Sequence, residues 1–234
     1  TLPAAINYHE IYEELDSLVL AVYMPSAYVQ PSKMAKYVEK GGGGNLTLGG
    51  RETGVRRLMT ANLLKRLESS VCSFRLTLER VLAVMNDALK TIDDYRNGLA
   101  TGASVADGDL PGGFDFDPDD EGGFEVGGAT KILIEDMDWM SWERDIKADA
   151  DIVEVLIAMV RDIDPAHDAK LIELCEQIRD KVRSPINPGN RKVLVFTAFS
   201  DTADYLYENV SEFAARELGL ECAKVTGDGC ACTI

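Results

Sequence analysis

A regular apolar periodicity between residues 64 and 92 is the feature that most constrains the fold of this chain. Successive apolar residues are three or four positions apart, which places them on one face of a helix. They are Leu64, Leu67, Val71, Phe74, Leu78, Val81, Met85, Leu89 and Ile92. The pattern predicts one amphipathic helix from near Arg51 to near Asn97-Gly98. Its nearly heptad spacing implies packing along another long helix of the same chain, in a bundle or hairpin.

Shorter helical patterns flank this segment. The predicted helices span residues 8–20, a stretch that opens at Pro25, residues 137–161 and residues 167–182. Pro25 suits the first turn of a helix, where its missing N–H is not needed. Residues 40–50 are rich in glycine, which is entropically costly inside a helix or strand. We therefore expect a loop there.

Residues 98–130 differ in character from the helical segments. They contain eight acidic residues and abundant glycine, with neither Lys nor Arg before Lys131. Such a segment buries little apolar area, so we expect a mobile acidic loop over about 98–130. The spacing of Asp115, Asp117, Asp119 and Asp120 does not fit a calcium-binding loop.

The C-terminal part reads as one strand–helix–strand unit. Lys192–Thr197 (KVLVFT) is a continuous apolar run that suits a strand buried on both faces. A helix follows, with Ser200 or Asp201 as its cap and Gly219 at its end. Leu220–Val225 is predicted to be a second strand, parallel to the first.

Two parallel strands do not make a stable domain, because parallel sheets contain several strands and are covered on both faces. Ser184-Pro185 and Asn187-Pro188-Gly189 mark a linker ahead of the unit. The sequence therefore predicts a mostly α protein, helical over 1–183, with an incomplete α/β unit at 190–234. We expect the chain to be an internal part of a longer polypeptide.

Charge limits the possible function. The net charge of −16 argues against the whole chain as an autonomous nucleic-acid binder, because phosphates are contacted chiefly by Lys and Arg. Residues 51–80 are an exception, with seven basic and three acidic side chains, a local balance of +4. Apolar residues make up 46% of the chain, and no run is long enough to span a membrane. We expect a soluble, cytoplasmic protein that does not contact a membrane.

The five cysteines give no pattern typical of a metal or disulfide framework. They lie at positions 72, 175, 222, 230 and 232, without a Cys-x-x-Cys pair and with only two histidines in the chain. Cys230 and Cys232 are near enough in sequence to reach Cys222. We nevertheless predict free thiols and no metal site.

Several segments resemble Swi/Snf-type bacterial helicases, which are ATP-driven DNA translocases of superfamily two. Within Arg56–Arg80, the run LLKRLESS (Leu63–Ser70) is similar to the helical insertion between the two motor lobes of that family. Asp168–Leu171 (DAKL) is similar to an aspartate-x-lysine element ahead of the second lobe. KVLVFTAFSDTADYL, at 192–206, resembles helicase motif four, and VTGDG, at 225–229, occupies the place of the next motif.

The resemblance implies that 1–183 is a helical-bundle insertion and that 190–234 opens a RecA-like second lobe. It implies ATP and magnesium as cofactors of the parent protein, and DNA and the remaining lobes as partners. The chain contains no G-x-x-x-x-G-K-S/T phosphate loop and no acidic strand-end motif for magnesium. We therefore expect no catalytic residue and no cofactor in this chain, which should be inactive alone.

Two groups of residues are candidates for nucleic-acid binding. The resemblance implies contacts from the polar strand ends of the second lobe, here Thr197, Ser200, Gly227 and Gly229. The basic cluster of the long helix adds Arg51, Arg56, Arg57, Lys65 and Arg66. A structural interpretation remains open for both groups: Ser200 would only cap a helix, and the basic residues would form a solvated or lobe-contacting face.

A second class of function remains open. The chain could be a non-catalytic helical module for protein–protein interaction, with the long helix and the acidic loop as its docking surfaces. Absence of nucleic-acid affinity at low salt, where phosphate contacts are strongest, would favour this alternative.

Overall fold

The computed structural model describes residues 8–38, 48–99, 102–106, 131–227 and 229–233, and these residues are mostly helical. The α-helices are α1 (Tyr8–Ser17), α2 (Ala35–Val38), α3 (Leu48–Ser69), α4 (Val71–Arg96), α5 (Trp139–Val160), α6 (Ala169–Arg183) and α7 (Ser200–Phe213). Short 3-10 turns span Ala21–Tyr23, Pro25–Tyr28 and Ile134–Asp136, and a π turn spans Ala214–Leu218. The strands are β1 (Ser104–Ala106), β2 (Lys131–Leu133), β3 (Ala223–Thr226) and β4 (Gly229–Cys232).

The chain divides into two compact units. Among the described residues, the bundle unit comprises those within 7–63 and 77–159, and the C-terminal unit those within 64–76 and 160–234. The predicted division lay at the linker after residue 183. In the structure, α6 and the tip where α3 meets α4 group with the C-terminal segment instead.

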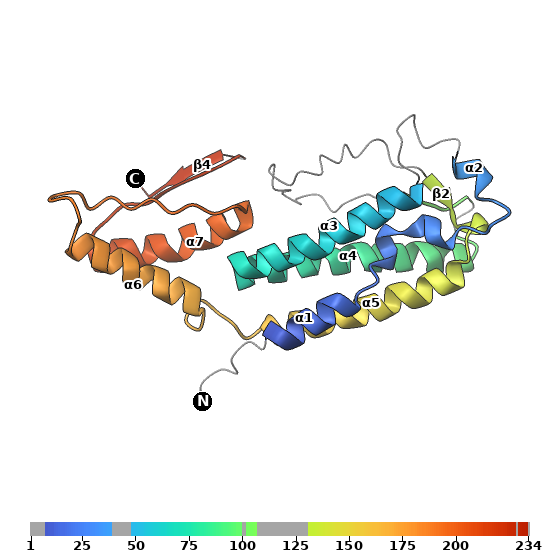
Figure 1. The fold of residues 1–234 in the computed structure, drawn as a ribbon, viewed down its shortest axis with the longest axis horizontal. Coiled ribbons are helices and arrows are strands. Elements are labelled where there is room, and N and C mark those ends of the chain that lie inside the picture. The colour runs from blue at the N-terminus through green and yellow to red at the C-terminus, as the bar shows by residue number, and fades with distance from the viewer. Residues whose placement is uncertain (1–7, 39–47, 100–101, 107–130, 228, 234) are drawn as a thin grey trace. The chain divides into compact units, whose positions relative to one another are not determined.

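The predicted long helix is interrupted at Ser70, which ends α3 and begins α4. The Ser70 N–H donates to the Arg66 carbonyl (2.9 Å), and the Ser70 hydroxyl accepts from the backbone N–H of Cys72 (3.2 Å) and Ser73 (3.5 Å). A serine that satisfies the first N–H groups of a new helix is an N-cap. Figure 1 shows the chain reversing here, so that α3 and α4 form an antiparallel hairpin.

The predicted apolar seam is confirmed. All its members are buried except Leu64 and Leu89, which are half-buried. In the bundle unit, the part of the seam from Leu78 to Ile92 is buried together with apolar residues of the N-terminal segment, α3 and α5. The fully buried members include Ile11, Leu20, Met59, Leu63, Leu78, Val81, Met85, Ile92, Ile146, Val153 and Leu156.

A buried carboxylate holds the N-terminal segment of the bundle unit against α5. Asp149 of α5 accepts from the backbone N–H groups of Val19 (2.8 Å) and Ala21 (2.7 Å). Between them, Leu20 adopts the left-handed conformation (φ 57°), which is uncommon for a residue with a side chain. The Trp142 indole N–H donates to the Ala21 carbonyl (2.9 Å). These bonds fix a turn whose backbone would otherwise be strained.

A second buried carboxylate, Asp136, organises the other end of the bundle unit. It accepts from Lys36 Nζ (2.6 Å) and from the Tyr37 hydroxyl (2.5 Å), which lowers its pKa. The Tyr37 hydroxyl also accepts from the Leu133 N–H (3.2 Å). Leu133 ends β2, which pairs antiparallel with β1, so this cluster ties α2 to the short sheet.

The core of the C-terminal unit lies between α6 and α7. Ile178, Val182 and Phe213 are buried there, with Leu174, Cys175, Val210, Leu218 and Leu220 packed against them. The apolar face predicted for 167–182 is thus confirmed, and it packs on α7. As predicted, Gly219 closes the helix, with a left-handed φ of 61° that glycine adopts without a steric penalty.

The predicted strand–helix–strand unit is formed only in part. Helix α7 is present, but Lys192–Thr197 is assigned neither helix nor strand. β3 pairs antiparallel with β4, in register from Ala223 opposite Cys232 to Thr226 opposite Gly229. A hairpin closes through a short local turn, whereas a parallel pair needs a crossover and further strands. The parallel pairing expected between Lys192–Thr197 and Leu220–Val225 is therefore absent from the described residues.

Some predicted features lie outside the described residues or differ in their limits. The acidic loop at 98–130 falls mostly outside them, as does most of the glycine-rich loop at 40–50; α3 already begins at Leu48. The other helices agree with the predicted ranges within a few residues, except that Pro25 opens a short 3-10 turn. Among the described residues, no helix combines the length and apolar character needed to cross a membrane.

Candidate functional site

Three segments that are far apart in the sequence contact one another in the C-terminal unit. They are the end of α3, the start of α6 and the segment that leads into α7. Their polar side chains form what we call the polar junction: Arg66, Ser69, Asp168, Lys170, Thr197, Asp201, Thr202 and Tyr205. These positions fall within LLKRLESS, DAKL and KVLVFTAFSDTADYL.

Arg66 is the centre of the polar junction. Its side chain is fully buried, and Nη1 lies 2.7 Å from Asp201 Oδ2 and 3.2 Å from Ser73 Oγ. The guanidinium also lies 4.6 Å from the centre of the Phe199 ring, within the range of a cation–π contact. Asp201 stands in the first turn of α7, where the helix dipole favours a negative charge.

Hydroxyl groups connect the same elements beside Arg66. Ser69 Oγ lies 3.0 Å from Thr202 Oγ1 and 3.4 Å from Thr197 Oγ1. Thr197 Oγ1 also accepts from the Phe199 N–H (3.4 Å). The cap position of α7 is Phe199, without a side-chain cap bond. The predicted cap at Ser200 or Asp201 is therefore wrong: Ser200 already lies inside the helix, and Asp201 binds Arg66.

The start of α6 contacts both neighbours. Asp168 caps α6, its Oδ1 accepting from the N–H groups of Lys170 (2.9 Å) and Leu171 (3.1 Å). Its Oδ2 accepts from the Tyr205 hydroxyl of α7 (2.9 Å). Burial, together with this bond to a carboxylate, raises the pKa of Tyr205. One aspartate therefore both begins α6 and binds it to α7.

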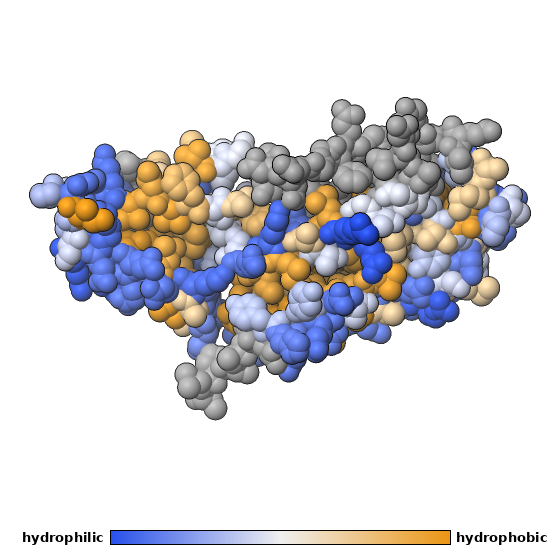
Figure 2. Space-filling model, viewed as in Figure 1, coloured by the Kyte–Doolittle hydropathy of each residue, from blue (hydrophilic) through white to orange (hydrophobic). Residues whose placement is uncertain are grey.

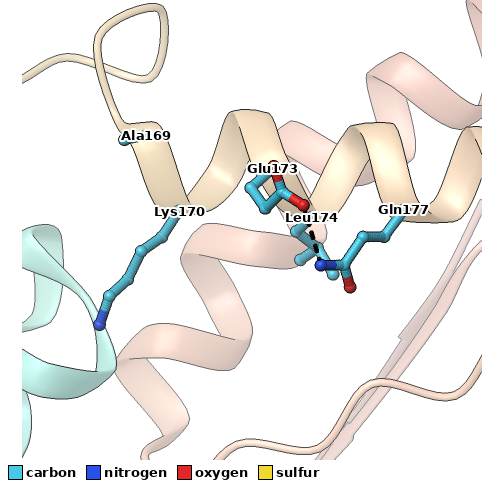
Figure 3. Close-up of a pocket in the computed structure, with 5 residues that line it drawn as sticks. All are labelled: Ala169, Lys170, Glu173, Leu174 and Gln177. Carbon is cyan, nitrogen blue, oxygen red and sulfur yellow. Dashed lines mark hydrogen bonds between the residues drawn. The ribbon is translucent and has the colours of Figure 1, made fainter.

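Lys170 makes the corresponding contact with α3. Figure 3 shows its side chain reaching from the first turn of α6 to the neighbouring helix, where Nζ donates to the carbonyl of Glu68. A cation is favourable at the C-terminal end of a helix, where carbonyl groups lack helical partners. Glu68 is the second-last residue of α3. Lys170 therefore caps the helix that carries Arg66.

An open hollow of about 420 Å³ runs along the same face of α6. Its lining residues are Ala169, Lys170, Glu173, Leu174 and Gln177 (Figure 3). Gln177 donates to Glu173 (3.0 Å), so these two polar groups satisfy each other. The hollow shows no set of groups arranged for catalysis.

An exposed apolar segment, Val193–Phe196, precedes α7. Leu194 is 82% exposed and Phe196 is 88% exposed. Figure 2 shows a broad hydrophobic area on the surface of the C-terminal unit. Single exposed apolar residues are normal, but four in succession indicate an interaction surface.

The structure places the predicted basic cluster in several environments. Arg66 is buried and therefore inaccessible to a phosphate group. Arg56 is half-buried and donates to the Leu18 carbonyl (3.3 Å), Arg57 is exposed and Lys65 is half-buried. Arg51 belongs to α3, but its side chain lies outside the described residues. Among the members whose side chains the structure describes, Arg57 is the exposed one.

The predicted strand-end group is divided between two places. Thr197 belongs to the polar junction and Ser200 precedes its member Asp201; both are half-buried. Gly227 follows β3 and Gly229 begins β4; both are exposed, and the Thr226 hydroxyl donates to the Gly229 carbonyl (3.3 Å). These two glycines are therefore accessible to a ligand.

Neither chemical clusters nor known relatives identify a function. All five cysteines are outside disulfides, and the described residues contain no group of three or more His, Cys, Asp or Glu side chains that could hold a metal ion. Comparison of the chain with protein families, with curated proteins and with solved structures finds no match.

Sequence reasoning missed three contributors to the polar junction. The sequence offers Asp201 only as a cap and does not single out Tyr205, and it places Arg66 in a basic cluster that either contacts nucleic acid or forms a solvated or lobe-contacting face. The partners of these residues are more than thirty positions away: Arg66 and Asp201 are 135 residues apart, and Asp168 and Tyr205 are 37 apart. No local pattern signals such pairs.

Proposed function

We propose that this chain is an internal part of a Swi/Snf-type ATP-dependent DNA translocase, in which it provides the helical insertion and the start of the second motor lobe. The observation that carries the proposal is the polar junction. The segments that resemble that family meet through the pairs Arg66–Asp201, Lys170–Glu68 and Asp168–Tyr205. On this proposal the polar junction joins the insertion to the lobe.

The exposed segment Val193–Phe196 gives further support. A strand of a parallel sheet is apolar on both faces because helices cover both sides of the sheet. Here the apolar side chains are present, but the described residues supply neither a strand partner nor a cover. On this proposal, the other strands of the sheet belong to the remainder of the parent protein.

On this proposal the chain positions other parts of the motor and carries out no step of ATP hydrolysis itself. Hydrolysis of ATP needs a phosphate-binding loop and carboxylates that hold magnesium. The sequence lacks the G-x-x-x-x-G-K-S/T pattern, so this chain does not supply the phosphate-binding loop. We assign ATP and magnesium to the parent protein and derive no catalytic step from this chain.

Contact with DNA is proposed for accessible groups. Arg57 and Lys65 of α3 and the backbone of Gly227 and Gly229 can contact phosphate oxygens, whereas buried Arg66 cannot. Phosphate contacts are independent of base sequence and weaken as salt rises. With a net charge of −16, the isolated chain should bind duplex DNA weakly and only at low salt.

The DNA contact can be tested by fluorescence anisotropy with a short labelled duplex at several salt concentrations. We expect weak binding that falls with salt, and a further loss in the double variant Arg57→Gln/Lys65→Gln. The matched control is Arg161→Gln/Arg183→Gln, which removes the same charge from two exposed arginines elsewhere. Equal loss in both variants, or no binding at the lowest salt, would contradict a specific contact.

Parentage has its own test. The coding sequence on both sides of this segment should encode a phosphate loop upstream and an arginine-bearing helicase motif downstream, in the same reading frame. ATPase activity that copurifies with this chain alone would overturn the proposal. Flanking sequence that lacks both the phosphate loop and the arginine-bearing motif would also overturn it.

A protein–protein interaction module is the second candidate, and the exposed apolar segment Val193–Phe196 is the observation that favours it. On that alternative the segment binds a separate partner protein instead of further strands of the same chain. Absence of DNA binding at low salt, together with flanking sequence that lacks helicase motifs, would favour it.

A further inference from the structure

The hairpin of β3 and β4 carries two cysteines on one face. Side chains alternate between the faces of a strand, and residues directly opposite each other share a face. Cys230 and Cys232 are two residues apart on β4, so they share a face. The register adds their partners Val225 and Ala223 to the same face. On its paired residues, this thiol face therefore contains two thiols and two apolar side chains, and Glu221, two residues before Ala223, borders it.

The opposite face of the hairpin packs on α7. Lys224 of β3 forms an ion pair with Asp204, and its Nζ lies 5.8 Å from the centre of the Tyr207 ring; both partners belong to α7. Ala231, opposite Lys224, is half-buried. The thiol face therefore points to solvent, and Cys230, Cys232 and Val225 are all exposed.

The third cysteine of the hairpin lies on the other face. Cys222 precedes β3 and is hydrogen-bonded to Thr233, whose N–H donates to the Cys222 carbonyl (3.0 Å). Cys222 alternates with Ala223 and is therefore directed away from the thiol face. It is half-buried, and burial raises its pKa. The sequence left open that all three cysteines meet, but the strand register separates Cys222 from the pair.

The spacing of the pair suits two-coordinate metal binding. Two residues of a strand advance about 6.7 Å, which is near the upper limit of about 6.8 Å between the Cα atoms of a disulfide. Parallel side chains at this spacing can lean together around a single ion, since a metal–thiolate bond adds about 2.3 Å on each side. Zinc would need about four ligands, whereas a soft monovalent ion accepts two thiolates.

We infer that Cys230 and Cys232 form a two-thiolate site for copper(I). Thiolates are the soft ligands that select copper(I), and the cross-strand neighbours of the two cysteines, Val225 and Ala223, offer no competing hard ligand. Each thiol releases one proton to water as its sulfur binds, so one ion displaces two protons and no electron is transferred. The inference is independent of the proposed translocase function.

The test is a titration of the reduced protein with copper(I) under anaerobic conditions, against a chromophoric copper(I) chelator. One ion should bind per chain. Cys230→Ser and Cys232→Ser should each weaken the affinity by more than about a hundredfold, since losing even an outer-shell partner costs about 10- to 100-fold. Cys222→Ser, in the same hairpin but on the other face, should bind copper(I) as the wild type does.

Several outcomes would overturn the inference. Binding that survives in the double variant Cys230→Ser/Cys232→Ser, or that is lost equally in Cys222→Ser, would place the ion elsewhere. One ion per two chains, with a dimer in size-exclusion chromatography, would mean bridging between copies. Zinc bound more tightly than copper(I) would exclude a two-thiolate site. Circular dichroism of each serine variant checks that the fold is retained.

Discussion

The guanidinium of Arg66 lies 2.7 Å from the carboxylate of Asp201, and the Arg66 side chain has no exposed surface. The pair joins the end of α3 to the first turn of α7. A buried charge pair contributes little net stability, because desolvation of both ions offsets their attraction. Removal of only one partner is costly, however, because the other charge is then left buried without a counter-ion.

We therefore expect Asp201→Asn to destabilise the protein by about 3 kcal/mol, close to the cost of breaking a buried pair. Replacing both partners, in Arg66→Met/Asp201→Leu, should restore part of that loss. Urea denaturation of Arg66→Met, Asp201→Leu and the double variant measures the coupling. Arg57→Met, which changes an exposed arginine of the same helix, should have almost no effect. Additive losses in the double variant would contradict the pairing.

Ser70 is the residue that separates α3 from α4, and we expect Ser70→Ala to lower the free energy of unfolding by about 1 kcal/mol through loss of the N-cap. Ser70→Asp retains an acceptor at the cap and should cost less. Thermal and urea denaturation check both variants. If the two helices were one continuous helix, alanine would instead stabilise it, because alanine has the higher helix propensity.

The Tyr205 hydroxyl links α7 to the capping carboxylate of α6. Tyr205→Phe should cost about 1.5 kcal/mol, as for a hydrogen bond to a charged group. Tyr207→Phe is the matched control, because it removes a hydroxyl from the same helix while keeping the ring that Lys224 faces. Equal destabilisation by both changes would mean that the bond to Asp168 contributes nothing specific.

Asp149 should give the bundle unit an unusual pH dependence. Burial raises its pKa, although the backbone N–H groups that it accepts from act in the opposite direction. The folded protein therefore binds this proton more tightly than the unfolded chain, whose aspartates titrate near about 3.9. The stability that this group contributes is present at low pH and is lost as the pH rises through its raised pKa.

The free energy of unfolding of the wild type minus that of Asp149→Asn should accordingly fall as the pH rises from about 4. Asp145, on the same helix, has a lowered pKa, chiefly because it pairs with Arg144. For Asp145→Asn the corresponding difference should rise with pH. Denaturation over a pH series, followed by the fluorescence of buried Trp142, distinguishes the two slopes. A flat difference for Asp149→Asn would contradict the raised pKa.

The exposed segment ahead of α7 should tolerate polar substitution. Leu194→Ser and Phe196→Ser should each change the free energy of unfolding by less than about 0.5 kcal/mol, as for surface residues. Ile178→Ala, in the buried α6–α7 core, should cost about 2 to 5 kcal/mol. The two serine variants should also aggregate less, because an unpaired apolar segment is open to association. A loss of several kcal/mol on serine substitution would mean that the segment is buried.

The helices could largely be predicted because their signals are local. The seam from Leu67 to Ile92 and the face formed by Leu171 and Ile178 follow from periodicity, which any window of the sequence displays. The end of α7 at Gly219 also follows from a local requirement for a left-handed conformation. Of the candidate site, the sequence supplied the segments but not the contacts between them.

Only the tertiary structure decided the features that involve residues far apart in the sequence. Ser70 reverses the chain within a periodicity that continues through it, and the β3–β4 hairpin forms where a parallel partner was expected. Arg66 appears as one of several basic residues until Asp201, 135 positions away, pairs with it. Local periodicity determines which residues face a core, whereas burial and pairing of charges depend on which segments meet, and that is settled by packing of the whole unit.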